Sequence, residues 1–264
     1  MNARYSRIAH AFLPVAAPVA DDSLESVISA LNPPADASLL DIGCGRGEIL
    51  LRFLARHVAS GVGIDIDAVA IEEARDKAAA AGLAGRARFE VTAAADYAPP
   101  GAIDLCICVG ASHALGGLEG TLSWAAGHLA PAGQLLLGAG YWKRPPVPDY
   151  LDAFGGSADA LCGRFEVVEL AESHGFTCTW SRMSSESDWD RYEGLYRLAM
   201  SQWLAANPAD ADAEGFRRRS ETWYRSYLRW GRDTMGFGLW LFALKDRRRA
   251  QPPAGRNASV SLAQ

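Results

Sequence analysis

A short glycine-rich stretch holds the residues of this sequence whose types and spacing point most clearly to chemistry. In LLDIGCGRGEILLRF, residues 39–53, an apolar run leads into a turn and apolar periodicity then resumes. This pattern predicts a strand, a tight turn and a helix. The turn contains three alternating glycines, Gly43, Gly45 and Gly47. Glycines let the backbone approach a ligand closely, so the pattern is typical of a nucleotide-binding turn.

Two acids flank this turn and indicate which kind of nucleotide it suits. Dinucleotide-binding turns have the spacing G-x-G-x-x-G and a helix N-terminus that faces a pyrophosphate. Here the spacing is G-x-G-x-G, with Asp41 just before the turn and Glu48 just after it. Both carboxylates would repel a diphosphate. A cationic cofactor removes that conflict, because Asp41 could hold an ammonium group directly or through water.

A third acid, Asp65, lies near the end of GVGIDID, where the second predicted strand ends. An acid at this place can accept hydrogen bonds from two ribose hydroxyls. The neighbouring Ile66 could cover one face of an adenine. Together these features describe adenosine that carries a positively charged amino-acid arm, which is S-adenosylmethionine.

LLDIGCGRGE followed by GVGIDID resembles the first two motifs of class I S-adenosylmethionine-dependent methyltransferases. Asp41 and the three glycines match the glycine motif, and Asp65 matches the acid that binds ribose. The resemblance implies a methyl-transferring enzyme with S-adenosylmethionine as its cofactor; the alternative is a glycine turn that serves packing alone. The implied cofactor-binding residues are Asp41, Gly43, Cys44, Gly45, Gly47, Asp65, Ile66, Asp96, Val109 and Gly110.

Later segments extend the resemblance over almost the whole chain. VGASHALGG, HLAPAGQLLLGAGYW and DWDRYEGLY with YLRWGRDTMGFGLWL resemble a family of bacterial methyltransferases with a helical insertion near the C-terminus, most of which have no assigned substrate. Two positions depart from the pattern. Ala93 replaces an acid that often meets the adenine amino group, so this contact comes from Asp96, from a backbone group or from neither. Ala139 replaces an acid that often precedes Gly-Tyr-Trp, so substrate choice could differ here.

The catalytic candidates follow from what methyl transfer requires. The carbon is already activated by the sulfonium, so the protein mainly aligns the acceptor, excludes water and takes up a proton. The loop VGASHALGG follows the fourth predicted strand, beside the expected methyl group, and we predict His113 there as the proton acceptor. Alternatively, His113 hydrogen-bonds to backbone or orients a neighbour. Tyr141 is the second candidate; with Trp142 it could wall the substrate pocket or pack the insertion onto the sheet.

Aromatic residues recur at roughly helical spacing in the C-terminal part: Trp189, Tyr192, Tyr196 and Trp203, then Trp223, Tyr227 and Trp230. Such stripes form core more often than sites, but an aromatic lid could surround a cationic or flat substrate and shed water. Glu193 and Asp190 could steer an amine, although acids on helices are commonly exposed. Tyr5 and His10 belong to an N-terminal arm, which often folds over the cofactor in this class.

The elements that must position these residues alternate along the chain. From about 38 to 140, five apolar runs alternate with helix-period segments or loops, and 175–183 and 235–245 read as two further strands. Two helices, 188–206 and 212–231, interrupt the sheet between the last two strands. The predicted fold is therefore α/β, a Rossmann-like, doubly wound, mostly parallel seven-stranded sheet with a helical insertion between its last two strands.

The predicted domain organisation is simple. We divide the chain into an N-terminal arm and helix, residues 1–36, and a methyltransferase domain, 37–246. The domain includes the helical insertion, 187–232, as a lid. The tail, 247–264, is predicted to be disordered.

Composition and charge narrow the expected partners. The 264 residues have a formal net charge of −5 and no basic stripe, so we expect a small-molecule substrate and consider nucleic acid unlikely. No apolar run reaches the roughly 18 residues of a membrane helix, so we expect no membrane partner and a cytoplasmic location. The five cysteines form no metal-ligand cluster, so no metal is expected. We expect a monomer or homodimer. The alternatives are methylation of RNA or protein, and a non-catalytic protein that binds S-adenosylmethionine or S-adenosylhomocysteine.

Overall fold

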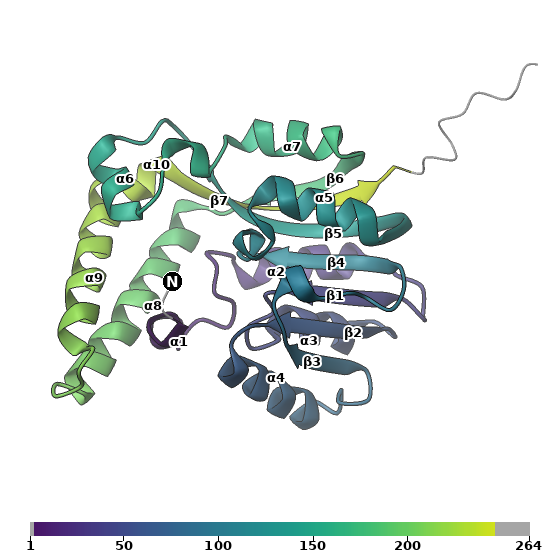
Figure 1. The fold of residues 1–264 in the computed structure, drawn as a ribbon, viewed down its shortest axis with the longest axis horizontal. Helices are drawn as coiled ribbons and strands as arrows, with labels where there is room; N and C mark the ends of the chain where they lie inside the picture. The colour runs from purple at the N-terminus through teal and green to yellow at the C-terminus, as the bar shows by residue number, and fades with distance from the viewer. Residues whose placement is uncertain (1–2, 246–264) are drawn as a thin grey trace, which may run out of the picture.

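The protein is built around a seven-stranded sheet (Figure 1). The computed structural model describes residues 3–245, so the predicted tail at 247–264 lies outside the described residues. The strand order is β3-β2-β1-β4-β5-β7-β6. Strands β1 to β5 pair in parallel, and β7 runs antiparallel to both of its neighbours. The strands are β1 Ser38–Ile42, β2 Ser60–Asp65, β3 Ala87–Val91, β4 Ile103–Val109, β5 Leu129–Trp142, β6 Phe176–Met183 and β7 Met235–Leu244. The predicted sheet and its mostly parallel pairing are confirmed.

Helices connect the strands and cover both faces of the sheet. The α-helices are α1 Ala3–Ala9, α2 Asp21–Ala30, α3 Glu48–Arg56, α4 Ala68–Ala80, α5 Leu118–His128, α6 Pro148–Phe154, α7 Arg164–Ser173, α8 Glu186–Ala206, α9 Ala213–Ser226 and α10 Arg232–Thr234. Short 3-10 turns occur at η1 Ala94–Asp96, η2 Ser112–Leu115 and η3 Ala158–Ala160, and a π-helical turn, η4, spans Tyr227–Gly231.

The two faces of the sheet bury alternate residues of the same strands. In β4, Leu105 and Ile107 pack in a cluster with α2, α3 and α4, whereas Cys106 and Cys108 pack in a second cluster with α5 and α7. Side chains of a strand point alternately to opposite faces, so strands covered on both sides read as nearly continuous apolar runs. This explains why the apolar runs located the strands correctly.

The helical insertion lies between β6 and β7, as predicted. Helix α8 begins at a capping box, in which the Ser185 hydroxyl accepts from the backbone N–H of Asp188 and the Asp188 carboxylate accepts from the backbone of Ser185. Helices α8 and α9 pack with α1 in a third cluster that includes Tyr5 and Phe216. We call α1, α8 and α9 the helical cover.

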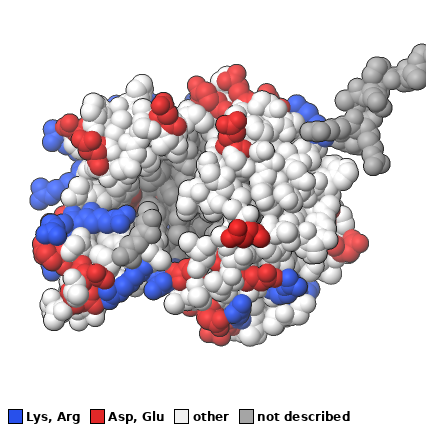
Figure 2. All heavy atoms as spheres, viewed as in Figure 1, with Lys and Arg blue, Asp and Glu red and all other residues white. Residues whose placement is uncertain are grey.

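The helical cover faces the carboxyl ends of the parallel strands (Figure 1). In the space-filling view the surface is hollowed between the cover and the sheet (Figure 2). Ligands of open α/β folds bind outside the carboxyl ends of the strands, so this hollow is where a site is expected.

Strand β5 contains residues that are typical of a turn. It begins at Leu129, before Pro131, Ala132 and Gly133. The Pro-Ala-Gly residues form an irregularity within the strand: Ala132 has a φ of 64°, and the register with β4 shifts between Ile103 and Leu105. The strand therefore continues through a bulge where the turn residues indicated an end.

Candidate functional site

The three glycines of the first turn have different surroundings. All have positive φ, with values of 66° for Gly43, 50° for Gly45 and 72° for Gly47. A Cβ on Gly43 would lie 2.3 Å from the Cβ of Ala111, and one on Gly47 would lie 2.6 Å from the Phe89 ring. A Cβ on Gly45 would meet nothing within 4 Å. Two glycines are therefore required by packing inside the protein, and the middle one leaves open space for a ligand.

The backbone of the turn is held by the neighbouring strand. The N–H groups of Gly43 and Cys44 both donate to the carbonyl oxygen of Ile64, at 2.9 and 3.0 Å. The Cys44 thiol is turned inward, since a Cβ on Gly63 would lie 2.9 Å from its sulfur. Cys44 therefore serves the turn through its backbone, and its side chain packs.

Asp65 is fixed beside the open glycine. Its Oδ2 accepts from the backbone N–H of Gly45 at 2.9 Å, and its Oδ1 accepts from the backbone N–H of Asp67 at 2.9 Å. Each carboxylate oxygen can accept further hydrogen bonds, so both remain able to receive ribose hydroxyls. The next side chain, Ile66, is 74% exposed, which leaves a large apolar surface free to cover an adenine.

Asp41 is a buried acid at the end of β1, only 3% exposed. Burial raises its pKa to about 8, and the negative charge of Asp65 adds to this effect, while a hydrogen bond with the backbone of Leu50 opposes it. A positively charged group placed nearby would reverse the shift and stabilise the ionised carboxylate. These residues thus fit a cofactor with a ribose, an aromatic base and a cationic arm.

The segment after β4 completes this edge of the sheet. The backbone N–H of Gly110 donates to the carbonyl oxygen of Gly138 at 2.8 Å, and Gly110 has a φ of 73°. Val109 is half-buried at the end of the strand, and His113 is exposed in η2. Turn η2 packs against η1, in which Asp96 is exposed. The structure therefore brings the predicted Asp96 and His113 onto adjacent turns. We call residues 41–47, 65–67 and 109–113 the glycine edge.

The N-terminal arm is tied to the glycine edge through residues that sequence reasoning did not identify. Arg46 donates to the carbonyl oxygens of His10 and Leu13, at 2.7 and 2.6 Å. Arg7 donates to both carboxylate oxygens of Asp67, at 2.9 and 2.8 Å. No local pattern marks these arginines, because their partners lie tens of residues away in the sequence.

His10 joins the arm to the helical cover. Its Nδ1 donates to the carbonyl oxygen of Ser6 at 2.7 Å, so its Nε2 accepts from the Tyr192 hydroxyl at 2.8 Å. Burial lowers the pKa of His10, and the charge of Arg46 adds to this effect. The ring is therefore neutral at pH 7, with its free nitrogen directed at Tyr192.

The two acids singled out on α8 have opposite environments. Asp190 is exposed and accepts from the Tyr227 hydroxyl at 2.6 Å and from Arg232 at 2.9 Å. Glu193 is only 1% exposed, which corrects the expectation that acids on this helix are exposed. It is buried because α9 packs over it, and Trp223 donates to its Oε2 at 2.9 Å.

Tyr141 lies in the core on the α7 side of the sheet. Its ring is 4% exposed, packs edge-to-face with Trp240 at 6.2 Å and fills the space left by Gly236. It also lines a surface pocket of about 480 Å³ with Lys143 and Arg164. Packing is thus the role that its contacts support, and its catalytic role stays a prediction.

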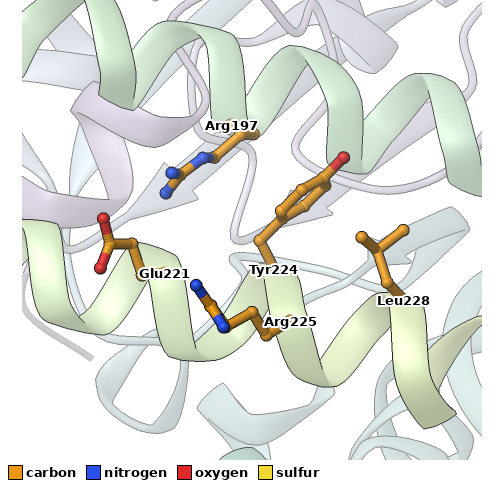
Figure 3. Close-up of a pocket in the computed structure, with 5 residues that line it drawn as sticks. All are labelled: Arg197, Glu221, Tyr224, Arg225 and Leu228. Atoms are coloured by element: carbon orange, nitrogen blue, oxygen red, sulfur yellow. The ribbon is translucent and has the colours of Figure 1, made fainter.

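A second surface pocket is lined mainly by residues of α8 and α9, which we call the helical pair (Figure 3). It has a volume of about 320 Å³ and is lined by Arg197, Glu221, Tyr224, Arg225 and Leu228. Arg197 already donates to the Ser220 hydroxyl at 2.9 Å and lies over the Tyr224 ring at 5.6 Å. The guanidinium of Arg197 is therefore already engaged by residues of α9.

Within residues 3–245, no group of three or more His, Cys, Asp or Glu side chains is placed to hold a metal ion. None of the helices in the same range has the length and apolar character to cross a bilayer.

Comparisons with known proteins show which chains this protein resembles. Residues 39–133 match the family described as Methyltransferase domain. The chain is 29% identical over 235 residues to the uncharacterized protein YjhP of Escherichia coli, covering 86% of this chain and 92% of that protein. The crystal structure of YjhP has a TM-score of 0.85 to this structure, at 27% identity, and the match covers 92% of this chain and all of that chain.

Two further solved structures contain a ligand. The S-adenosylmethionine-dependent methyltransferase of Thiobacillus denitrificans, in complex with S-adenosylhomocysteine, has a TM-score of 0.83 at 29% identity; the match covers 90% of this chain and 97% of that chain. Its counterpart from Geobacter sulfurreducens, also with S-adenosylhomocysteine, has a TM-score of 0.84 at 27% identity and the same coverage. The Rossmann-like fold predicted from the sequence is confirmed.

Proposed function

We propose that this chain, a class I S-adenosylmethionine-dependent methyltransferase, transfers the methyl group to a small molecule held in the hollow between the glycine edge and the helical cover. The observation that carries the proposal is the open space at Gly45, beside the fixed Asp65 carboxylate, together with the buried Asp41, on which the charge of Asp65 acts. The predicted enzyme class and cofactor class agree with the methyltransferase-domain match.

Each residue of the glycine edge would have a defined task toward S-adenosylmethionine. Asp65 would accept from the ribose hydroxyls, Ile66 would cover the adenine, and Asp41 would face the cationic amino-acid arm. The cofactor supplies a methyl group that its sulfonium makes electrophilic. Support comes from the two similar methyltransferases that were crystallised with S-adenosylhomocysteine.

The helical cover would shield the reaction from water and orient the acceptor. The N-terminal arm, which continues from α1 of the cover, lies against the loop after β4. A Cβ on Gly110 would lie 3.6 Å from the carbonyl oxygen of Ala16 in this arm. Because α1, α8 and α9 cover the hollow, they restrict the size of the acceptor that can enter it. This restriction favours a small molecule over RNA or protein. His113, exposed in η2 after β4, stays our predicted proton acceptor, from which a proton can pass to bulk water.

We further propose a cytoplasmic enzyme that acts as a monomer or homodimer. The five cysteines are free thiols, which suits a reducing compartment. The alternatives of RNA or protein methylation, and of a protein that only binds the cofactor, are separated from this proposal by the presence or absence of turnover with small acceptors.

Calorimetric titration with S-adenosylmethionine, S-adenosylhomocysteine and NAD tests the proposal. We expect about micromolar binding of the two sulfur ligands and none of NAD. Incubation with S-adenosylmethionine and small amines, phenols and carboxylates should then release S-adenosylhomocysteine. Binding of NAD alone would contradict the assignment, and sulfur-ligand binding without turnover of any acceptor would favour a binding protein.

A further inference from the structure

Glu193 is a buried carboxyl group in which one oxygen accepts no hydrogen bond from the described residues. Its side chain is 1% exposed, its Oε2 accepts from Trp223, and its Oε1 has no hydrogen-bond partner within the described chain. No arginine, lysine or histidine of residues 3–245 forms an ion pair with it. A buried acceptor without a partner is costly, and more so when it is charged, so the free oxygen of Glu193 needs an explanation.

Aromatic rings surround this carboxyl group. Burial, followed by the charge of Glu193, raises the pKa of both Tyr150 and Tyr192, so both phenols lie near the carboxyl. Trp223 contacts it directly, and Trp189, one helical turn earlier on α8, stacks with Tyr227 at 6.4 Å. The indole N–H of Trp189 is also buried without a partner among the described residues. A carboxylate within aromatic rings is an environment that attracts an organic cation.

The residue that precedes Glu193 is linked to the glycine edge. Tyr192, the residue before Glu193, donates to His10, and the backbone of His10 accepts from Arg46 of the glycine turn. The π-helical turn η4 carries Tyr227 and ends the helical pair. Single π turns within helices occur frequently at functional sites. Tyr192, which adjoins Glu193 on α8, is therefore connected to the glycine edge through two hydrogen bonds.

Asp190 shows that this arrangement is specific to Glu193. It lies on the same helix, is exposed, and has both a guanidinium and a phenol as partners. Arg232 lowers its pKa, and the Tyr227 hydroxyl adds to this effect. One acid is therefore satisfied by the protein, whereas the other lacks a cationic partner.

We propose that the methyl acceptor is a small amine, and that the Glu193 carboxylate and its ring of aromatic side chains bind the ammonium group. The proposal rests on the proposed function, since it names the acceptor class of the same hollow. In this structure aromatic side chains cover the Glu193 carboxylate, which is 1% exposed. Binding of the amine therefore requires α8 and α9 to move apart. Glu193 then has the cation that residues 3–245 do not provide.

The proposed chemistry balances without any further reactant. The bound ammonium gives one proton to the Glu193 carboxylate and becomes a neutral amine. Its lone pair forms the new N–C bond as the C–S bond of the sulfonium breaks, and that electron pair stays on sulfur. The product is an N-methylammonium ion, and the proton held by Glu193 passes to solvent when the product leaves, which restores the carboxylate.

The test measures binding rather than turnover. Protein saturated with S-adenosylhomocysteine is titrated calorimetrically with primary amines from ethylamine to benzylamine, each paired with the alcohol of the same carbon skeleton. We expect at least one amine to bind about tenfold or more tightly than its alcohol, because a charge-assisted hydrogen bond contributes on this scale. If no amine binds more tightly than its alcohol, the proposal is wrong.

Glu193→Gln keeps the shape of the side chain and removes the charge. It should abolish the preference for the amine and leave the affinity for S-adenosylhomocysteine unchanged. Glu221→Gln, an exposed acid of α9, is the matched control and should keep the preference. A preference that survives in Glu193→Gln would also overturn the proposal. If Glu193→Gln does not fold, the proposal is still tested by comparing the affinities of amine and alcohol for the unmodified protein.

The two proposals fail in different ways. If S-adenosylhomocysteine does not bind to the unmodified protein, the proposed function fails. If it binds and amines show no preference over alcohols, only the amine proposal fails.

Discussion

The glycine edge and the helical cover border the same hollow but are held together differently. The glycine edge is fixed by backbone groups: Gly43 and Cys44 both donate to Ile64, and Gly45 donates to Asp65. The cover is held by side chains from distant parts of the chain, such as His10 with Tyr192 and Trp223 with Glu193. Backbone geometry allows little variation, whereas side-chain contacts can be exchanged. We therefore expect the glycine edge to keep its geometry, and the helical cover to be the region that can adapt to an acceptor.

Adding a methyl group at Gly43 should cause the largest loss of stability of any change in the glycine edge. Gly43→Ala places a Cβ 2.3 Å from Ala111 and keeps a positive φ, so we expect a loss of about 2–5 kcal/mol in the free energy of unfolding. Gly45→Ala meets no neighbour and should lose only about 1–2 kcal/mol, from its backbone conformation. Urea denaturation of both variants measures the difference. Equal losses would show that packing at Ala111 does not hold this edge.

Removing the Asp65 carboxylate should weaken the cofactor site without unfolding the protein. Asp65→Ala loses the charge-assisted hydrogen bonds to ribose, so the affinity for S-adenosylhomocysteine should fall by about 1–3 kcal/mol. Calorimetric titration measures the change, with Asp76→Ala, an exposed acid of α4, as the control. Unchanged affinity in a folded Asp65→Ala protein would remove the ribose assignment.

Asp41 should make the stability of the cofactor-free protein depend on pH. Its folded pKa of about 8 lies above the ordinary value of 3.8, so between these values the folded protein binds a proton that the unfolded chain has released. The free energy of unfolding therefore decreases as the pH rises through this window, by at most about 1.4 kcal/mol per pH unit. Glu193, with its pKa raised to about 7 mainly by burial, contributes with the same sign.

Asp41→Asn should reduce the pH dependence of the free energy of unfolding, and the part contributed by Glu193 should remain. Urea denaturation at several pH values between about 5 and 8 provides the measurement. In the unmodified protein at pH 7, binding of the cationic cofactor should also release a proton from Asp41, detected as a calorimetric heat that depends on the buffer. A buffer-independent heat would contradict the placement of the cationic arm at Asp41.

His113 is the last residue of the glycine edge, and its removal should have the smallest effect on binding. His113→Ala should leave the affinity for S-adenosylhomocysteine within about 0.5 kcal/mol, because the ring is exposed. Turnover against pH then tests its predicted role as proton acceptor. If turnover is unaffected at every pH, that role is wrong.

The same contrast explains what the sequence could predict. The glycine turn, Asp65 and the strands were predictable because their signals are local: glycines at alternate positions, an acid at a strand end and continuous apolar runs. Arg46 and Arg7 were not, because each contacts a partner at least 33 positions away. Glu193 was misjudged for the same reason, since its burial depends on Trp223, which lies 30 positions further along.

The position of β7 determines the order in which this protein can fold. The last strand fits between β5 and β6, pairing with β5 from Gln134 to Trp142 and with β6 from Phe176 to Met183. Until residues 235–244 leave the ribosome, both older strands have unpaired edges, and exposed edges invite pairing with other chains. The helical pair precedes β7, so it is synthesised before the sheet that supports it is complete. Closure of the sheet and docking of the helical cover should therefore occur late, as one of the slower, long-range steps of folding.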